Sequence, residues 1–277
     1  MGTGMPGFGR GNKAEQGIEV LVYGLIIKLR RRGGSQVNKI VAINGSPKGK
    51  ASNTNVMVGA FLKGAQAAGA ETVNVFLAEK DVKHCRGCFS CWLSTPGQCV
   101  IKDAMAEILA LCEGVDIFVL ATPLYFDNIS GMLKDFMDRM IVKGDPHFEK
   151  GSNGECRHLK RIDAPSPKLV MISNCGFSER SHFQVISHWI KRAALNMKTE
   201  VLGEFYAAQG GLLSINTDEL RPIITGYLRN LENAGRAIAL GQSVSEETKR
   251  LLEQNFIPDE VYIQKANSYF DTVLNNK

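Results

Sequence analysis

Short runs of β-branched and other apolar residues alternate with longer amphipathic stretches over most of this chain. Five such runs predict buried strands, at residues 39–44, 71–77, 115–122, 168–174 and 200–207. Apolar residues at helical spacing predict helices at residues 54–68, 103–112, 129–142, 181–197, 217–241 and 245–274. Residues 143–167 hold three Gly and three Pro, which predicts a long excursion between a helix and the fourth strand.

Alternation of strands and helices predicts a parallel sheet that is covered on both faces. Five strands in one unit fit the flavodoxin-like doubly wound α/β fold with strand order 2-1-3-4-5, here with extra C-terminal helices. We expect residues 39–210 to form this domain, with a cysteine-rich loop at 81–102, and residues 211–277 to pack on it as a helical extension. Residues 1–38 lack this periodicity, and we expect them to be a disordered or non-native N-terminal extension.

Composition and charge narrow the class of protein. The 277 residues are 44% hydrophobic and 22% charged, which is typical of a globular chain. Residues 1–38 hold six Lys/Arg against two Glu, so the rest of the chain is close to neutral and gives no electrostatic argument for nucleic-acid binding. The longest apolar run, Val20 to Ile27, is too short to span a membrane and precedes no cleavage site. We therefore expect a cytoplasmic protein without a membrane partner.

The first of three unusual loops follows the strand at 39–44 and has the sequence NGSPKGKASNT. It leaves the carboxyl end of its strand, where sheets of this kind bind ligands. Its glycines permit tight turns, and its hydroxyl, amide and helix N-terminal N–H groups suit a phosphate. The loop matches neither the triphosphate-binding nor the dinucleotide-binding glycine motif. An ordinary capped turn, with Asn53 or Thr54 as the cap, explains the same residues equally well.

The other two loops follow the third and fourth predicted strands. The sequence TPLYFDN at 122–128 stiffens the strand exit with proline and offers aromatic surface to a flat, heteroatom-rich ring. The sequence SNCGF at 173–177 has small residues that let a ligand approach the backbone. Each loop also has a plainer interpretation, because the aromatic residues can pack into the core and the last loop can be a simple turn.

Together the three loops resemble the NAD(P)H-dependent FMN reductase branch of the flavodoxin-like superfamily. The resemblance rests on GSPKGKASNT and on TPLYF followed by SGMLKDFMDR, and it covers Lys39 to Ala207. It implies that the domain at 39–210 binds FMN. By this likeness the FMN phosphate would be held by Ser46, Lys48, Ser52, Asn53 and Thr54. The isoalloxazine would be framed, largely through backbone N–H groups, by Pro123, Leu124, Tyr125, Phe126 and Asn128, and closed on its other side by Asn174, Cys175 and Gly176.

Four of the seven cysteines, Cys85, Cys88, Cys91 and Cys99, fall within fifteen residues. In a cytoplasmic chain this crowding points to metal or redox chemistry rather than to disulfides. The first three stand at every third position, the usual run for a [4Fe–4S] cluster, whereas zinc sites more often use two separated C-x-x-C pairs. The spacing also resembles that of iron–sulfur flavoproteins, which are flavodoxin-like proteins with such a loop at this point of the fold. Zinc, and free or redox-paired thiols without a metal, stay open as alternatives.

The resemblance implies an FMN-dependent oxidoreductase that moves electrons between NAD(P)H or another donor and a small-molecule or protein acceptor, with a [4Fe–4S] cluster that passes one electron at a time. Hydride transfer to flavin requires no side-chain acid, so we name no catalytic residue. The alternatives are a cluster-free NAD(P)H-dependent FMN or quinone reductase, a non-catalytic flavodoxin-like electron carrier, and a zinc-stapled binding module. We expect a homodimer or homotetramer, with residues 143–167 and the C-terminal helices as contacts.

Overall fold

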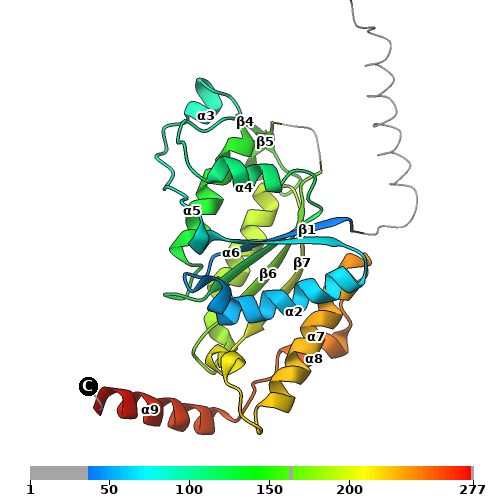
Figure 1. Ribbon diagram of the computed structural model, residues 1–277. Helices are drawn as coiled ribbons and strands as arrows, with labels where there is room; N and C mark the ends of the chain where they lie inside the picture. Colours follow the sequence, from blue (N-terminus) through cyan, green and yellow to red (C-terminus); the bar gives the residue numbers. More distant parts are fainter. Residues whose placement is uncertain (1–36, 162–164, 276–277) are drawn as a thin grey trace, which may run out of the picture. The chain divides into compact units, whose positions relative to one another are not determined.

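A five-stranded parallel sheet forms the centre of the computed structural model, which describes residues 37–161 and 165–275. The strand order is β2-β1-β3-β6-β7, with all neighbours parallel. The strands are β1 (Lys39–Asn44), β2 (Glu71–Phe76), β3 (Ile117–Pro123), β6 (Lys168–Asn174) and β7 (Val201–Ala207). Without the two strands of a separate hairpin, this order is 2-1-3-4-5, so the predicted doubly wound fold is confirmed (Figure 1).

Helices cover both faces of this sheet (Figure 1). The helices of the described residues are α2 (Asn53–Ala67), α3 (Ser90–Leu93), α4 (Met105–Leu111), α5 (Gly131–Arg139), α6 (Gln184–Asn196), α7 (Arg221–Ala239), α8 (Glu246–Leu252) and α9 (Asp259–Asn275). Of these, α3 lies in the cysteine-rich loop and α9 buries no residue. Short 3-10 turns lie at Gly49–Ala51, Leu77–Glu79, Met140–Lys143, Arg180–Phe183 and Gly210–Ser214. The predicted elements before residue 242 agree with the observed ones to within a few residues, and the structure adds the short helix α3 inside the predicted cysteine-rich loop and a hairpin in the predicted excursion.

Two apolar layers, one on each face of the sheet, form the core. All seven residues of β3 are buried, because a central parallel strand is covered on both sides. One layer packs β1, β3 and β6 against α2 and α7, and the other packs the opposite side of the sheet against α4, α5 and α6. The contact between α2 and α7 depends on glycine: a Cβ added to Gly64 would lie 1.8 Å from the carbonyl oxygen of Glu232.

The C-terminal segment differs from the single helix predicted over 245–274. The structure divides it into α8 and α9, separated by residues 253–258. The side-chain oxygen of Gln209 accepts hydrogen bonds from the backbone N–H groups of Phe256 and Ile257, each at 3.1 Å. The Phe256 ring packs edge-on against Tyr227 of α7, with ring centroids 5.0 Å apart. These tertiary contacts hold the segment out of a helix, and Pro258 directly precedes α9.

The excursion predicted at 143–167 contains a second, two-stranded antiparallel sheet of β4 (Gly144–Lys150) and β5 (Cys156–Lys160). This hairpin packs on the cysteine-rich loop. Trp92 lies against His158 with ring centroids 4.8 Å apart, and its indole N–H donates to the carbonyl oxygen of Ile141 at 2.9 Å. The expected role of the excursion as an oligomer contact stays a prediction.

The N-terminal extension predicted for residues 1–38 lies outside the described residues, apart from Val37 and Asn38. The backbone N–H of Val37 donates to the carbonyl oxygen of Ala239 at 3.0 Å, and that of Asn38 donates to the carboxylate of Asp116 at 2.8 Å. These two residues therefore belong to the α/β domain, while the domain boundaries as a whole stay a prediction. Within residues 37–161 and 165–275, every helix is too short or too polar to cross a membrane.

Candidate functional site

Three loops converge at the carboxyl edge of the sheet, where β1, β3 and β6 end at neighbouring positions of the register. Backbone hydrogen bonds join them in pairs. The N–H of Gly45 donates to the carbonyl oxygen of Ala121 at 2.8 Å, and the N–H of Leu124 donates to that of Asn174 at 2.9 Å. The structure therefore brings together the three loops that the sequence singles out.

The first and third loops are also joined by their side chains. The amide of Asn174 donates a 2.9 Å hydrogen bond to the hydroxyl oxygen of Thr54. Both side chains are almost completely buried, at 8% and 1% exposure. The Thr54 hydroxyl therefore ties the third loop to the first turn of α2, and the backbone N–H of Thr54 remains free for a ligand.

The first loop is a capped turn with open N–H groups at its helix start. Ser52 is the N-cap of α2: its hydroxyl oxygen accepts from the N–H of Asn55 at 3.0 Å and its hydroxyl donates to the carbonyl oxygen of Gly49 at 2.7 Å. The N–H groups of Asn53 and Thr54 have no partner among the described residues. Lys48 of the same loop is exposed, whereas Ser46 is buried. Free helix N-terminal donors beside a cation form an anion-binding arrangement.

The second loop is a tight turn closed by two mutual backbone bonds between Tyr125 and Asn128, at 3.0 and 3.1 Å. Phe126 and Asp127 at its tip both have left-handed backbone angles, with φ of 49° and 56°. Non-glycine residues rarely adopt this conformation, and such strain gathers at functional sites. Because the N–H groups of Leu124, Tyr125 and Asn128 are bonded internally, only those of Phe126 and Asp127 are free within the described part of this loop.

Side chains of the second loop are mostly exposed. Phe126 is fully exposed and Tyr125 is about half exposed, so the interpretation that both aromatic residues are core is wrong. Pro123 is buried at the strand end, and Leu124 is half-buried. An exposed aromatic pair at a ligand-binding edge is available to a flat ring or to a partner molecule.

The third loop combines a buried thiol with exposed backbone. Burial raises the pKa of Cys175, and its thiol lies 3.6 Å from the carbonyl oxygen of Phe177. Gly176 is exposed, and its carbonyl oxygen accepts a 2.6 Å hydrogen bond from the hydroxyl of Tyr262 at the start of α9. The C-terminal segment therefore reaches the candidate ligand site.

One residue of this edge, His182, is absent from the set predicted from the sequence. Its ring stacks on Phe177 with centroids 4.2 Å apart, and its Nδ1 lies 3.1 Å from a carboxylate oxygen of Asp127. It thus connects the second and third loops. Nothing in the local sequence indicates this position, because His182 lies in a 3-10 turn whose direction is set by the tertiary fold.

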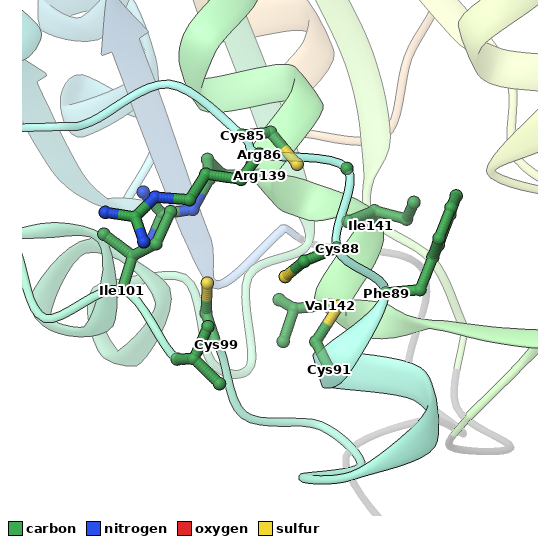
Figure 2. Close-up of a pocket in the computed structure, with 12 residues that line it drawn as sticks. Cys85, Arg86, Cys88, Phe89, Cys91, Cys99, Ile101, Arg139, Ile141 and Val142 are labelled. Carbon is green, nitrogen blue, oxygen red and sulfur yellow. The ribbon is translucent and has the colours of Figure 1, made fainter.

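The four clustered cysteines line a single pocket, with Ile101, Arg139, Ile141 and Val142 on its other walls (Figure 2). All seven cysteines of the chain are free thiols. Among the four, Cys91 at the start of α3 is buried and Cys88 is exposed. Burial raises the pKa of Cys91, whereas hydrogen bonds from Ser90 lower the pKa of Cys88.

A zinc ion and a cubane cluster place different demands on the spacing of these thiols. Among the described residues, no three His, Cys, Asp or Glu side chains lie close enough together to hold one metal ion. A tetrahedral zinc site needs its thiolates around a single ion, with Zn–S distances of about 2.3 Å. A cubane cluster binds each cysteine through a different iron, so its ligands lie further apart. Four free thiols around one largely apolar pocket fit the donor set of such a cluster.

A buried ion pair closes the base of the cysteine-rich loop. Arg139, the last residue of α5, donates from Nη1 and Nη2 to the two carboxylate oxygens of Asp103, at 2.6 and 3.0 Å. Both side chains are buried, at 1% and 0% exposure. Asp103 also accepts from the N–H of Lys83 at 2.9 Å, and Arg139 donates to the carbonyl oxygen of Lys83 at 2.9 Å. The two ends of the loop, 20 residues apart, are therefore fixed to each other and to α5.

The electrostatics of this pair follow from its geometry. Burial acts to raise the pKa of Asp103, but hydrogen bonds from Arg139 and from the N–H groups of Lys83 and Met105 outweigh it and hold the pKa below its usual range. Hydrogen bonds to Asp103 raise the pKa of Arg139, burial opposes this, and the nearby Cys99 adds to the rise. Both groups are therefore charged at neutral pH.

Helix α5 connects the two candidate sites. At its N-terminus the hydroxyl of Ser130 donates to the carbonyl oxygen of Gly45 at 2.6 Å and accepts from the N–H of Leu133, which caps the helix. At its C-terminus Arg139 lies on the wall of the cysteine pocket. Nine residues at 1.5 Å each make the helix about 13 Å long. The three-loop edge and the cysteine pocket are therefore the two ends of one short rigid element.

Comparisons with known proteins agree with this arrangement. Residues 38–210 match the model of the NADPH-dependent FMN reductase family. An iron-sulfur flavoprotein of Archaeoglobus fulgidus is 37% identical over 116 residues, which are 42% of this chain and 51% of the relative. An iron-sulfur flavoprotein of Methanosarcina thermophila is 36% identical over 110 residues, which are 40% of this chain and 56% of the relative. The matches thus span about half the length of these curated relatives.

Two solved structures share the fold at low sequence identity. An FMN-dependent NADH-azoreductase from Bacillus anthracis, in complex with FMN, superposes with a TM-score of 0.53 at 19% identity, over 73% of this chain and 99% of that chain. An NAD(P)H:quinone oxidoreductase from Methanothermobacter marburgensis has a TM-score of 0.53 at 17% identity, over 74% of this chain and 98% of that chain. At these identities the likeness shows the flavodoxin-like fold.

Proposed function

This chain belongs to the NADPH-dependent FMN reductase family, and from that premise we propose that it is an FMN-dependent oxidoreductase. It moves electrons between NAD(P)H or another donor and a small-molecule or protein acceptor. The observation that carries the proposal is the convergence of three loops at one sheet edge, joined by the bonds of Leu124 to Asn174 and of Asn174 to Thr54. That edge is where doubly wound sheets bind flavin.

The first loop holds the FMN phosphate in this proposal. The free N–H groups of Asn53 and Thr54 supply donors at the positive end of α2, and Lys48 supplies a charge. Ser46 and Ser52 shape the loop from within: the N–H of Ser46 is bonded to the side chain of Asn44 at 3.1 Å, and the hydroxyl of Ser52 caps the helix. Ser46 and Ser52 thereby hold the loop in the conformation in which the free N–H groups of its other residues can bind the phosphate.

The second and third loops hold the isoalloxazine ring. The free N–H groups of Phe126 and Asp127 are the backbone donors available at its edge, while Pro123, Leu124, Tyr125 and Asn128 set the shape of the turn. Asn174 and Cys175 support the opposite side from a buried position, and Gly176 gives close access to the backbone. When bound, FMN supplies the hydride-accepting chemistry, and the protein's residues bind and orient it without a side-chain acid.

The cysteine pocket holds a [4Fe–4S] cluster with Cys85, Cys88, Cys91 and Cys99 as ligands. The donor set, the apolar walls and the similarity to proteins named iron-sulfur flavoproteins support this part of the proposal. A cluster at one end of α5 and a flavin at the other would let a two-electron carrier exchange single electrons with a partner.

We further propose that the protein works in the cytoplasm as a homodimer or homotetramer. Light scattering after size-exclusion chromatography measures the oligomeric state, and a monomer would contradict this part.

A cluster-free NAD(P)H-dependent FMN or quinone reductase is the second candidate function, because the three-loop edge does not depend on the cysteine pocket.

Anaerobic purification followed by an absorption spectrum, an iron assay and NAD(P)H oxidation separates these functions. A flavin spectrum together with iron and turnover supports the full proposal. Flavin and turnover without iron after reconstitution would favour the cluster-free reductase. Flavin without NAD(P)H oxidation, unless a redox partner is added, would favour an electron carrier.

A further inference from the structure

Arg139 has a buried hydrogen-bond donor that none of its described neighbours uses. Its Nη1 and Nη2 groups bind Asp103 and the carbonyl oxygen of Lys83, but its Nε is buried without a partner in the described part of the chain. Buried donors in native proteins almost always have an acceptor. A buried donor that is fixed in position and unused therefore indicates that an acceptor is missing. The guanidinium is held by two bonds to one carboxylate, which fixes its plane and the direction of its remaining donors.

The cysteine pocket, which Arg139 borders, is a candidate source of the missing acceptor. Arg139 is itself a wall of that pocket, and Figure 2 shows the sulfur of Cys99 turned toward the guanidinium group. The neighbouring walls, Ile101, Ile141 and Val142, offer no polar side chain. The other cation that lines the pocket, Arg86, is exposed, whereas Arg139 is buried. A buried charge in apolar surroundings acts on its neighbours with little screening.

We propose that Arg139 is a positioning residue of the cysteine site, which directs its guanidinium at the Cys99 side and donates a hydrogen bond to sulfur when the site is loaded. The inference rests on the proposed iron–sulfur function, because it concerns the group that the four cysteines hold. Asp103 contributes to this role, because it orients the Arg139 guanidinium and offsets part of its charge. Hydrogen bonds to sulfur and net charge are two of the factors by which a protein sets the reduction potential of such a cluster.

The sign of the effect follows from charge. Reduction adds an electron, so a nearby guanidinium and an N–H donor to sulfur favour the reduced state and raise the potential. Arg139→Gln removes both and should lower the potential. Asp103→Asn keeps the guanidinium but removes its counter-charge, and it should raise the potential. Loosening of the loop alone would not move the two variants in opposite directions.

The test is a redox titration of the reconstituted full-length protein under anaerobic conditions, followed by electron paramagnetic resonance. We expect the midpoint potential of Arg139→Gln to fall by an amount equal to about a tenfold change in the reduction equilibrium, about 59 mV for one electron. Asp103→Asn should shift in the opposite direction. Lys134→Gln is the matched control, because it removes a cation from an exposed pair with Asp138 on the same helix and should leave the potential unchanged.

Folding is monitored by FMN content and melting temperature. Arg139→Gln leaves Asp103 unpaired and can fail to fold for that reason. In that case the double variant R139Q/D103N, which removes both charges, replaces it in the redox titration. We expect its midpoint potential to fall by less than that of Arg139→Gln. Wild-type midpoint potential in R139Q or in the double variant, once the variant contains its cluster, would overturn the inference. A shift of the potential in the same direction and by the same amount in R139Q and D103N would also overturn it. Loss of iron from R139Q with unchanged flavin and melting temperature would also overturn it, since the pair would then serve only to shape the loop. Failure of the wild-type protein itself to take up iron would instead overturn the proposed cluster.

Discussion

The side-chain amide of Asn174 donates a 2.9 Å hydrogen bond to the hydroxyl of Thr54, 120 residues earlier in the chain. This bond ties the loop after β6 to the first turn of α2, and both partners are buried. The candidate flavin site is therefore a set of three loops that brace one another, rather than three independent turns. We therefore expect the stability of the fold and the binding of FMN to be linked through this pair.

Thr54→Val keeps the shape of the side chain but removes the acceptor for Asn174. We expect the free energy of unfolding to fall by about 1–3 kcal/mol, because a buried amide donor loses its partner. FMN affinity should weaken as the first turn of α2 loses its fixed position. Urea unfolding and fluorescence titration with FMN measure the two effects.

Thr72→Val is the control for that variant, because the Thr72 hydroxyl accepts a bond from Gln66 in an exposed position of β2. It should change stability by no more than about 0.5 kcal/mol and leave FMN affinity unchanged. Equal effects of the two substitutions would contradict the link between Asn174 and the ligand site.

Asp103→Ala should destabilise the protein far more than a comparable surface change. It leaves the guanidinium of Arg139 buried and unpaired, which costs about 3–5 kcal/mol in other buried pairs. Asp138→Ala removes an exposed partner of Lys134 and should cost less than about 1 kcal/mol. The comparison uses denaturant unfolding of both variants, and a surface-like cost for Asp103 would show that the ion pair does not fix the cysteine-rich loop.

Stability should fall in acid because of the same carboxylate. The pKa of Asp103 in the folded protein lies below its unfolded value of about 3.9, so the ion pair contributes fully above that pH. This contribution is lost as the pH falls through the depressed folded value. Plots of unfolding free energy against pH should therefore slope down below about pH 4 in the wild-type protein and less steeply in Asp103→Asn. Parallel curves would rule out this role.

Cys88→Ser should abolish iron uptake while leaving flavin content intact, because the cysteine pocket and the three-loop edge are separate sites at opposite ends of α5. Cys112→Ser is the matched control: burial raises the pKa of Cys112 to about 11, and the residue does not line the pocket. An iron assay after anaerobic reconstitution should find wild-type iron in the control. Iron retained in Cys88→Ser would remove Cys88 from the ligand set.

The sequence predicts the sheet and its functional edge because both follow from local periodicity. The apolar runs that became β1, β3 and β6 determine which loops meet, and the loop compositions indicate their use. Features that depend on distant partners were not predictable. The break before α9 depends on Gln209, 47 residues away from Phe256, and the loop base depends on Arg139, 36 residues away from Asp103. His182 likewise acquires its position from Phe177 and Asp127 through the fold.

Fluorescence titration of flavin-free, full-length protein with FMN measures directly whether the three-loop edge binds flavin. We expect saturable quenching of FMN fluorescence that ends at one FMN per chain, with weaker binding in Thr54→Val. Free FMN fluorescence that stays unquenched at every protein concentration, in a sample shown by circular dichroism to be folded, would contradict the assignment of the three-loop edge as a flavin site.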